Sequence, residues 1–161
     1  MNHTDFREDV IGGLVRHGGR LVSTEAFPWD PRDPDCDNDF HPGFRTQVDF
    51  PHWIVFLSSD GDPDWNDSDD YSVTFTLGAY FQHILDTSFE SVRDSMVQEL
   101  GNEWILEMAG DGVPGCWLER TIDGGQRNDV RGLTDEFVGL CTSVHDRLGA
   151  WPNVPRIERL T

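Results

Sequence analysis

Residues 71–100 constrain the fold more than any other stretch, because a strand pattern there is followed closely by a helix pattern. Apolar residues occupy every second position of 71–81, at Tyr71, Val73, Phe75, Leu77, Ala79 and Phe81. Ser, Thr and Gly lie between most of them. This period of two predicts a strand that buries one face and leaves the other more polar.

A capped amphipathic helix is predicted for 87–100. Thr87 and Glu90 form a T-x-x-E capping box, and Gly101 supplies a C-terminal stop. Apolar residues recur at helical spacing, at Phe89, Val92, Met96 and Leu100. A half-buried strand that leads into such a helix is typical of a small α+β domain, and we expect the other segments to pack on this pair.

Two further helices are predicted, one near each end of the chain. Thr4 is expected to cap the first, which ends at the His-Gly-Gly run 17–19, and Thr134 is expected to cap the last. The glycines at 12–13 each weaken the first helix by about 1 kcal/mol, so we expect it to depend on docking. The expected inward residues are Phe6, Val10, Leu14 and Val15 in the first helix, and Phe137, Leu140, Cys141, Val144 and Leu148 in the last.

Strand patterns complete the fold prediction. Pro51 interrupts the second strand region, which predicts an edge position or a kink there. The turn-rich run 110–115 predicts a hairpin between the last two strands. The five predicted strands are 20–27, 44–57, 71–81, 104–108 and 116–122. We therefore predict one α+β domain over 1–161, a mostly antiparallel five-stranded sheet with three helices in the order α-β-β-β-α-β-β-α.

The net charge of the chain limits the kinds of partner that it can bind. Its formal net charge is -18, with 30 acidic residues against 12 basic ones, all of them Arg. Coding bias or a salt-adapted cytoplasm, an acidic face for a basic protein partner, and imitation of nucleic-acid phosphate could each explain this balance. All three argue against direct nucleic-acid binding, because proteins bind that polyanion through Lys and Arg.

Two predicted surface loops, 28–43 and 58–70, concentrate the acids. This clustering between elements favours a local purpose, and an exposed Trp among carboxylates suits a hot spot that faces a basic, partly apolar surface. The predicted partner-binding residues are Trp29, Asp33, Asp35, Asp37, Asp39, Asp60, Asp62, Asp64, Trp65, Asp67, Asp69 and Asp70.

Metal-binding patterns are incomplete in the sequence. The segment 60–70 begins like an EF-hand calcium loop, but Trp65 occupies the glycine position and Tyr71 the position of the closing glutamate. Cys36, His41 and His52 do not complete a zinc set at a familiar spacing. We expect a solvated acidic loop without a metal or cofactor, with calcium binding by 60–70 as the alternative.

Catalytic motifs are not found in the sequence. It contains no G-x-S-x-G and no P-loop. Cys116 is expected to be a buried structural thiol, and His83 and His145 are expected to be surface or core histidines rather than bases. Glu107 and Glu119 fall on adjacent strands of the predicted hairpin, where paired acids could serve an enzyme. We predict a protein that is not an enzyme.

Three cysteines without C-x-x-C spacing predict free thiols in a reduced compartment. The N-terminal residues lack an apolar signal core, and no later segment is apolar over a membrane-spanning length. These features predict a cytoplasmic protein that does not bind membranes. The tail 150–161 is expected to lie across the surface.

The order of elements over 4–148, in an acidic chain of this length, resembles the class I type III secretion chaperones and the related YbjN-like peptide-binding domains. The resemblance implies a twisted antiparallel sheet with helices against it, often as a homodimer, that binds another protein and catalyses nothing. From charge and loops we expect a non-catalytic acidic protein of inhibitor or immunity type that captures a basic protein partner. A secretion or folding chaperone, a DNA-mimic decoy and a small metal-dependent enzyme are the alternatives.

Overall fold

An antiparallel sheet of six strands is the frame of the computed structural model, which describes residues 3–27, 43–60, 74–82, 88–110, 114–123 and 129–148. Each pair of neighbouring strands is antiparallel, and the order across the sheet is β1-β2-β3-β4-β6-β5. The strands are β1 (Arg20–Phe27), β2 (Gly43–Asp49), β3 (Ile54–Asp60), β4 (Thr74–Phe81), β5 (Ile105–Met108) and β6 (Cys116–Asp123).

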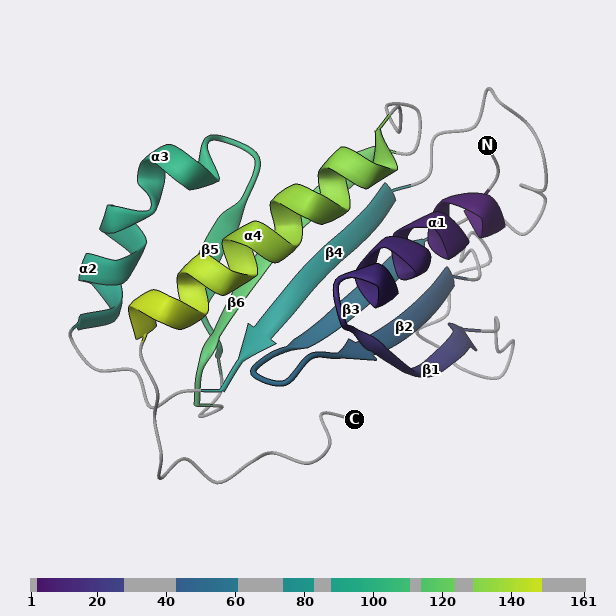
Figure 1. Ribbon diagram of the computed structural model, residues 1–161, viewed down its shortest axis with the longest axis horizontal. Coiled ribbons are helices and arrows are strands. Elements are labelled where there is room, and N and C mark those ends of the chain that lie inside the picture. The colour runs from purple at the N-terminus through teal and green to yellow at the C-terminus, as the bar shows by residue number, and fades with distance from the viewer. Residues whose placement is uncertain are drawn as a thin grey trace, which may run out of the picture.

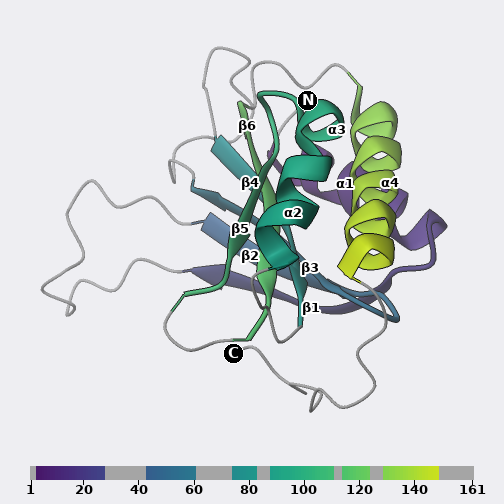
Figure 2. The same cartoon turned by 90° about the vertical axis from the view of Figure 1, so that its left-hand side faces the viewer.

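Four helices cover one face of this sheet (Figures 1 and 2). They are α1 (His3–Arg16), α2 (Ser88–Ser95), α3 (Val97–Leu100) and α4 (Val130–Leu148). The α1 and α4 helices pack side by side, and α2 contacts α4. The predicted α+β class and antiparallel sheet are therefore confirmed, whereas the predicted five strands and three helices are wrong, because two predicted elements are each divided.

The first divided element is the strand region 44–57, which forms a hairpin of β2 and β3. At its turn the amide of Phe50 donates to the carbonyl of Trp53 over 2.9 Å, and Val48 pairs with Val55. Pro51 lies in this turn, where its fixed φ and missing amide donor favour reversal of the chain. Of the two predicted alternatives, the edge position is wrong, since both strands lie inside the sheet, and the interruption at Pro51 is a chain reversal rather than a kink within one strand.

The second divided element is the helix predicted for 87–100. The hydroxyl of Ser95 donates to the carbonyl of Val92 over 2.7 Å. In an uninterrupted helix that carbonyl would accept the amide of Met96, which donates instead to Arg93 over 3.0 Å. The helix breaks there into α2 and α3, and Gly101 ends α3 with φ 59°, as predicted. Thr87 of the predicted capping box lies outside the described residues.

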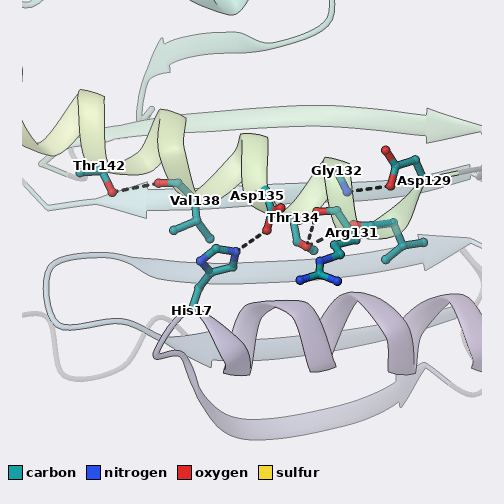
Figure 3. Close-up of polar contacts among 9 residues, drawn as sticks. His17, Asp129, Arg131, Gly132, Thr134, Asp135, Val138 and Thr142 are labelled. Atoms are coloured by element: carbon teal, nitrogen blue, oxygen red, sulfur yellow. Dashed lines mark hydrogen bonds and ion pairs between the residues drawn. The ribbon is translucent and has the colours of Figure 1, made fainter.

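The α4 helix begins five residues earlier than predicted. Asp129 is its cap, since the Asp129 carboxylate accepts a 2.8 Å hydrogen bond from the amide of Gly132 (Figure 3). Thr134 is buried inside the helix, where its hydroxyl donates to the carbonyls of Val130 and Arg131. The prediction of Thr134 as the cap is therefore wrong. Four of the five residues predicted to face inward are buried, Phe137, Leu140, Cys141 and Val144, and Leu148 is partly buried against the core.

The α1 helix begins at His3, so Thr4 lies within it and is not its cap. Gly18 ends the turn after the helix with φ 95°, as its sequence predicts. Three of the four expected core residues are fully buried: Phe6, Val10 and Leu14. Val15 is 46% exposed, because it lies about 100° around the helix from Leu14.

The core lies between the sheet and the helix layer. The side chains of β4 that face the helices are fully buried, as the alternation predicts: Phe75, Leu77, Ala79 and Phe81. Phe6 of α1 meets Phe75 with ring centroids 4.2 Å apart, and Trp104 stacks on Phe137 at 5.3 Å. Residues 71–73 of the predicted strand lie outside the described residues.

Candidate functional site

Of the twelve predicted partner-binding residues, only Asp60 lies within the described part of the chain. Asp60 is the last residue of β3, and its Cα pairs with that of Thr74 at the start of β4. The other eleven lie in 29–39 and 62–70, outside the described residues. What the structure adds is the position of the strand ends to which these segments are joined.

Both acidic segments are joined to the same end of the sheet. The first connects Phe27, the last residue of β1, to Gly43, the first of β2, and these two residues are register partners. The second connects Asp60 to Thr74, which are also partners, and Thr74 pairs in turn with Asp123 of β6. We call this end, defined by Phe27, Gly43, Asp60, Thr74 and Asp123, the acidic end; it lies on the right in Figure 1.

An aromatic cluster lies on the sheet face opposite the helices. Trp117 of β6 contacts Tyr80 and Phe56, with ring centroids 5.1 and 5.7 Å away. The guanidinium of Arg45 lies 4.4 Å from the Phe56 ring centroid, a cation–π contact. We call the residues Arg45, Phe56, Tyr80, Trp117 and Glu119 the aromatic face. None of the four described helices covers it (Figure 2).

Gly78 permits this cluster to form across three strands. In the register it lies between Phe56 of β3 and Glu119 of β6. A Cβ at Gly78 would lie 3.9 Å from the Trp117 ring, so a large side chain there would fill the space in which Phe56 and Trp117 meet. The hydroxyl of Tyr80 donates to the carbonyl of Pro114, and burial followed by the charge of Cys116 raises the pKa of Tyr80.

Carboxylates border the aromatic face. Asp49 at one side accepts a hydrogen bond from Gln47 and pairs with Arg20 over 3.5 Å. Glu107 and Glu119 lie at the other side, where Glu107 is the register partner of Trp117. Among the described residues, no cation pairs with Glu107 or Glu119. Phe56 and Tyr80 are buried and Trp117 is half-buried, so the aromatic face is a packed layer bordered by acids rather than an open apolar surface.

Because they lie in predicted strands, Trp53, Trp104 and Trp117 are expected in the core, and the structure separates them. Trp104 is buried, whereas Trp53 and Trp117 are half-buried. The prediction that Trp117 lies in the core is wrong, although the alternation of buried residues in β6 indicates which face Trp117 occupies. Cys116, Leu118 and Ile122 alternate as the buried set of this strand, which leaves Trp117 on the other face.

Two histidines meet at the end of the sheet away from the acidic end. The ring of His52, in the turn between β2 and β3, stacks on that of His145 in α4 with centroids 4.3 Å apart and an angle of 7°. Burial, followed by the neighbouring His52, lowers the pKa of His145, and Asp146 opposes the shift. Among the described residues, nothing pairs with the buried Nδ1 of His145 or Nε1 of Trp53.

The thiols of the described residues are poor nucleophiles. Cys116 and Cys141 are free and buried. Burial raises the pKa of Cys116 to about 12 and holds that of Cys141 well above its usual value. Since the thiolate is the reactive form, these residues have structural roles, as predicted for Cys116. Within the described part of the chain, no group of three or more His, Cys, Asp or Glu residues is arranged to hold a metal ion.

Comparison of this chain with protein-family models, with curated proteins and with solved structures finds no match. None of the described helices combines the length and the apolar character that crossing a bilayer requires.

Proposed function

We propose that this chain is a non-catalytic acidic binding protein, of inhibitor or immunity type, that captures a basic protein partner through its segments 28–43 and 58–70. The observation that carries the proposal is the attachment of both segments at the acidic end. Only the β2–β3 hairpin separates the segments in sequence, and their anchors Phe27, Gly43, Asp60 and Thr74 occupy four neighbouring strands.

Distances support the action of both segments on one partner. Neighbouring strands lie about 4.8 Å apart, so the two pairs of anchors are separated by roughly 10 Å. A standard protein interface covers about 800 Å² on each partner, which is wide enough to include both attachment points. Eleven acidic residues within 30–39 and 60–70 would therefore act on a single cationic surface.

The charge of the chain supports a particular kind of association. A net charge of -18 attracts a cationic partner over about a Debye length, roughly 8 Å at physiological salt. Such steering accelerates encounter and weakens as salt is added. Trp29 and Trp65, which lie among the acids in sequence, would supply the apolar contacts that slow dissociation.

Affinity capture from a lysate of the cells that produce the protein identifies the partner. The immobilised chain is exposed to lysate at low and at high salt, and the retained proteins are identified by mass spectrometry. We expect one stoichiometric basic protein, retained less at high salt. Retention of a salt-insensitive set of unfolded proteins would instead indicate a chaperone.

Variants of the second segment test the role of the acids. The test variant carries Asp62→Asn, Asp64→Asn, Asp67→Asn and Asp69→Asn. A control changes the same number of charges on exposed faces of α1 and α2: Glu8→Gln, Asp9→Asn, Glu90→Gln and Asp94→Asn.

The association rate for the captured partner is then measured as a function of salt. We expect the test variant to associate about tenfold more slowly at low salt with a shallower salt dependence, and the control to change far less. If both variants lose the same amount, net charge alone drives association. If neither changes, the segment 58–70 is not the binding surface.

A further inference from the structure

The β5 strand is an exposed edge of the sheet. Among the described strands it is outermost in the order, next to β6, and three of its four residues are exposed. Ile105 is 48% and Met108 57% exposed, which is high for large apolar side chains in a strand. An outermost strand presents alternate backbone amides and carbonyls without strand partners, and these can pair with another extended chain.

The opposite edge, β1, is less suited to accept another strand. The register between β1 and β2 shifts between Leu21 and Ser23, which leaves Val22 as an irregularity in the strand. Such bulges twist an edge and interrupt pairing. The pairing of β5 with β6 runs without a shift from Ile105 to Met108.

The side chains of β5 define what a neighbouring strand should carry. On the aromatic face, Ile105 pairs with Glu119 and Glu107 pairs with Trp117, so apolar and acidic residues alternate in both directions. Among the described residues, neither glutamate has a cationic partner. On the helix side, Leu106 is buried in the core and Met108 is exposed.

We propose that β5 accepts an extended, cationic and apolar segment of another protein as an added strand. Residues directly opposite in neighbouring strands interact most strongly, so each position of the segment is specified by its neighbour on β5. Apolar residues are required beside Ile105, Leu106 and Met108, and Arg or Lys is required beside Glu107. Read in the antiparallel direction, the pattern is apolar, basic, apolar, apolar.

The negative charge of this chain favours a cationic segment over a second copy of the chain as the added strand. Two copies would each bring a net charge of -18, and edge-to-edge pairing would place Glu107 of one copy near acids of the other. Like charges opposite one another destabilise strand pairing. A cationic segment instead neutralises Glu107.

The β5 edge is separate from the acidic end. Its residues pair with 116–119 of β6, whereas the acidic end is marked by Asp123 at the other terminus of that strand. The added strand therefore does not rest on the proposed function of the acidic segments, and the two sites can be tested separately.

The test uses a blocked hexapeptide, Thr-Val-Arg-Val-Val-Thr, titrated into the 15N-labelled full chain and followed by NMR. We expect chemical-shift changes at 105–108 and 116–119, and binding that weakens with salt. Two forms of the peptide, each N-methylated at alternate residues, distinguish strand addition from simple attraction. Only one alternate set of amides faces β5 in an added strand, so one form should lose binding and the other should retain it.

Protein variants test the contribution of Glu107. The Glu107→Gln variant should weaken peptide binding about two- to fivefold. Glu8→Gln, which removes the same charge from an exposed site on α1, should leave it unchanged. Both side chains are exposed, so neither substitution should impair folding.

Three outcomes would contradict the proposal that β5 accepts an added strand. They are shift changes confined to the acidic end, equal binding by both N-methylated forms, and a dimer in sedimentation experiments whose formation protects 105–108 from hydrogen exchange. The first of these would leave the proposed function of the acidic segments intact.

Discussion

Gly13 of α1 lies directly against Thr134 of α4, so that a methyl group on Gly13 would lie 2.6 Å from the Thr134 Oγ1 atom. The glycine thus allows the two helices to approach over the sheet. Beside this contact, the imidazole of His17, in the turn just after α1, lies 2.7 Å from the carboxylate of Asp135 in α4 (Figure 3). The two glycines of α1 weaken this helix and so predict that it depends on docking. In the structure, Gly13 is the glycine that makes the contact with α4.

Gly13→Ala should therefore destabilise the protein although alanine favours helices. Overpacking at such a contact costs about 1–3 kcal/mol in the free energy of unfolding, measured by urea denaturation. Gly12→Ala is the matched control, since a Cβ there has no neighbour within 4 Å, and it should stabilise by about 0.5–1 kcal/mol. In a Thr134→Ala background the cost of Gly13→Ala should shrink. An equal gain from both glycine substitutions would contradict the contact.

Asp129→Ala should lower the free energy of unfolding by about 1 kcal/mol, because it removes the acceptor for the amide of Gly132 at the start of α4. Asp129→Asn keeps a carbonyl oxygen in the same place and should recover most of the loss. Chemical denaturation of the three proteins measures both effects. If alanine and asparagine cost the same amount, the side chain of Asp129 does not cap α4.

The stack of His52 on His145 should make stability depend on pH. Burial and His52 lower the pKa of His145 in the folded protein from its usual 6.5, and Asp146 only partly opposes them. The unfolded chain therefore takes up this proton at a higher pH than the folded chain. Stability is complete above about pH 6.5 and falls as the pH drops through that value toward the folded pKa.

The His145→Phe variant keeps a ring in the stack and removes this titration. Urea denaturation between pH 8 and 5 should show a loss of stability for the wild type that is smaller in the variant. Glu99 contributes only at lower pH, because its Arg147 hydrogen bond lowers a pKa that is already near 4.5. Parallel pH profiles for wild type and variant would show that the histidine stack is not the cause.

Alkylation of the buried thiols should require unfolding. With a pKa of about 12, roughly one Cys116 side chain in ten thousand is a thiolate at pH 8, and Cys141 is held protonated as well. In a Cys36→Ser background, we expect iodoacetamide to modify neither thiol of the native protein within hours, and both after denaturation. Rapid labelling of native Cys116, located by mass spectrometry, would show that β6 opens readily.

Sequence patterns correctly predicted the buried face of those strands and helices in which apolar residues recur with a regular period. The alternation in β4 and the helical spacing in α4 identified buried residues correctly, because a residue's direction from the backbone follows from its position in a regular element. Where two local signals compete, prediction failed. Asp129 and Thr134 are both good capping residues, and Pro51 is compatible with an edge, a kink or a reversal.

The sequence by itself determined the acidic composition, the α+β class and most of the buried faces, since these depend on residue type and short-range periodicity. Only the tertiary structure decided that Phe27, Gly43, Asp60 and Thr74 share one end of the sheet, that Trp117 joins Phe56 across Gly78, and that β5 is an edge. Those relationships depend on strand order and register. Both arise from burial of the whole core, which no single segment encodes.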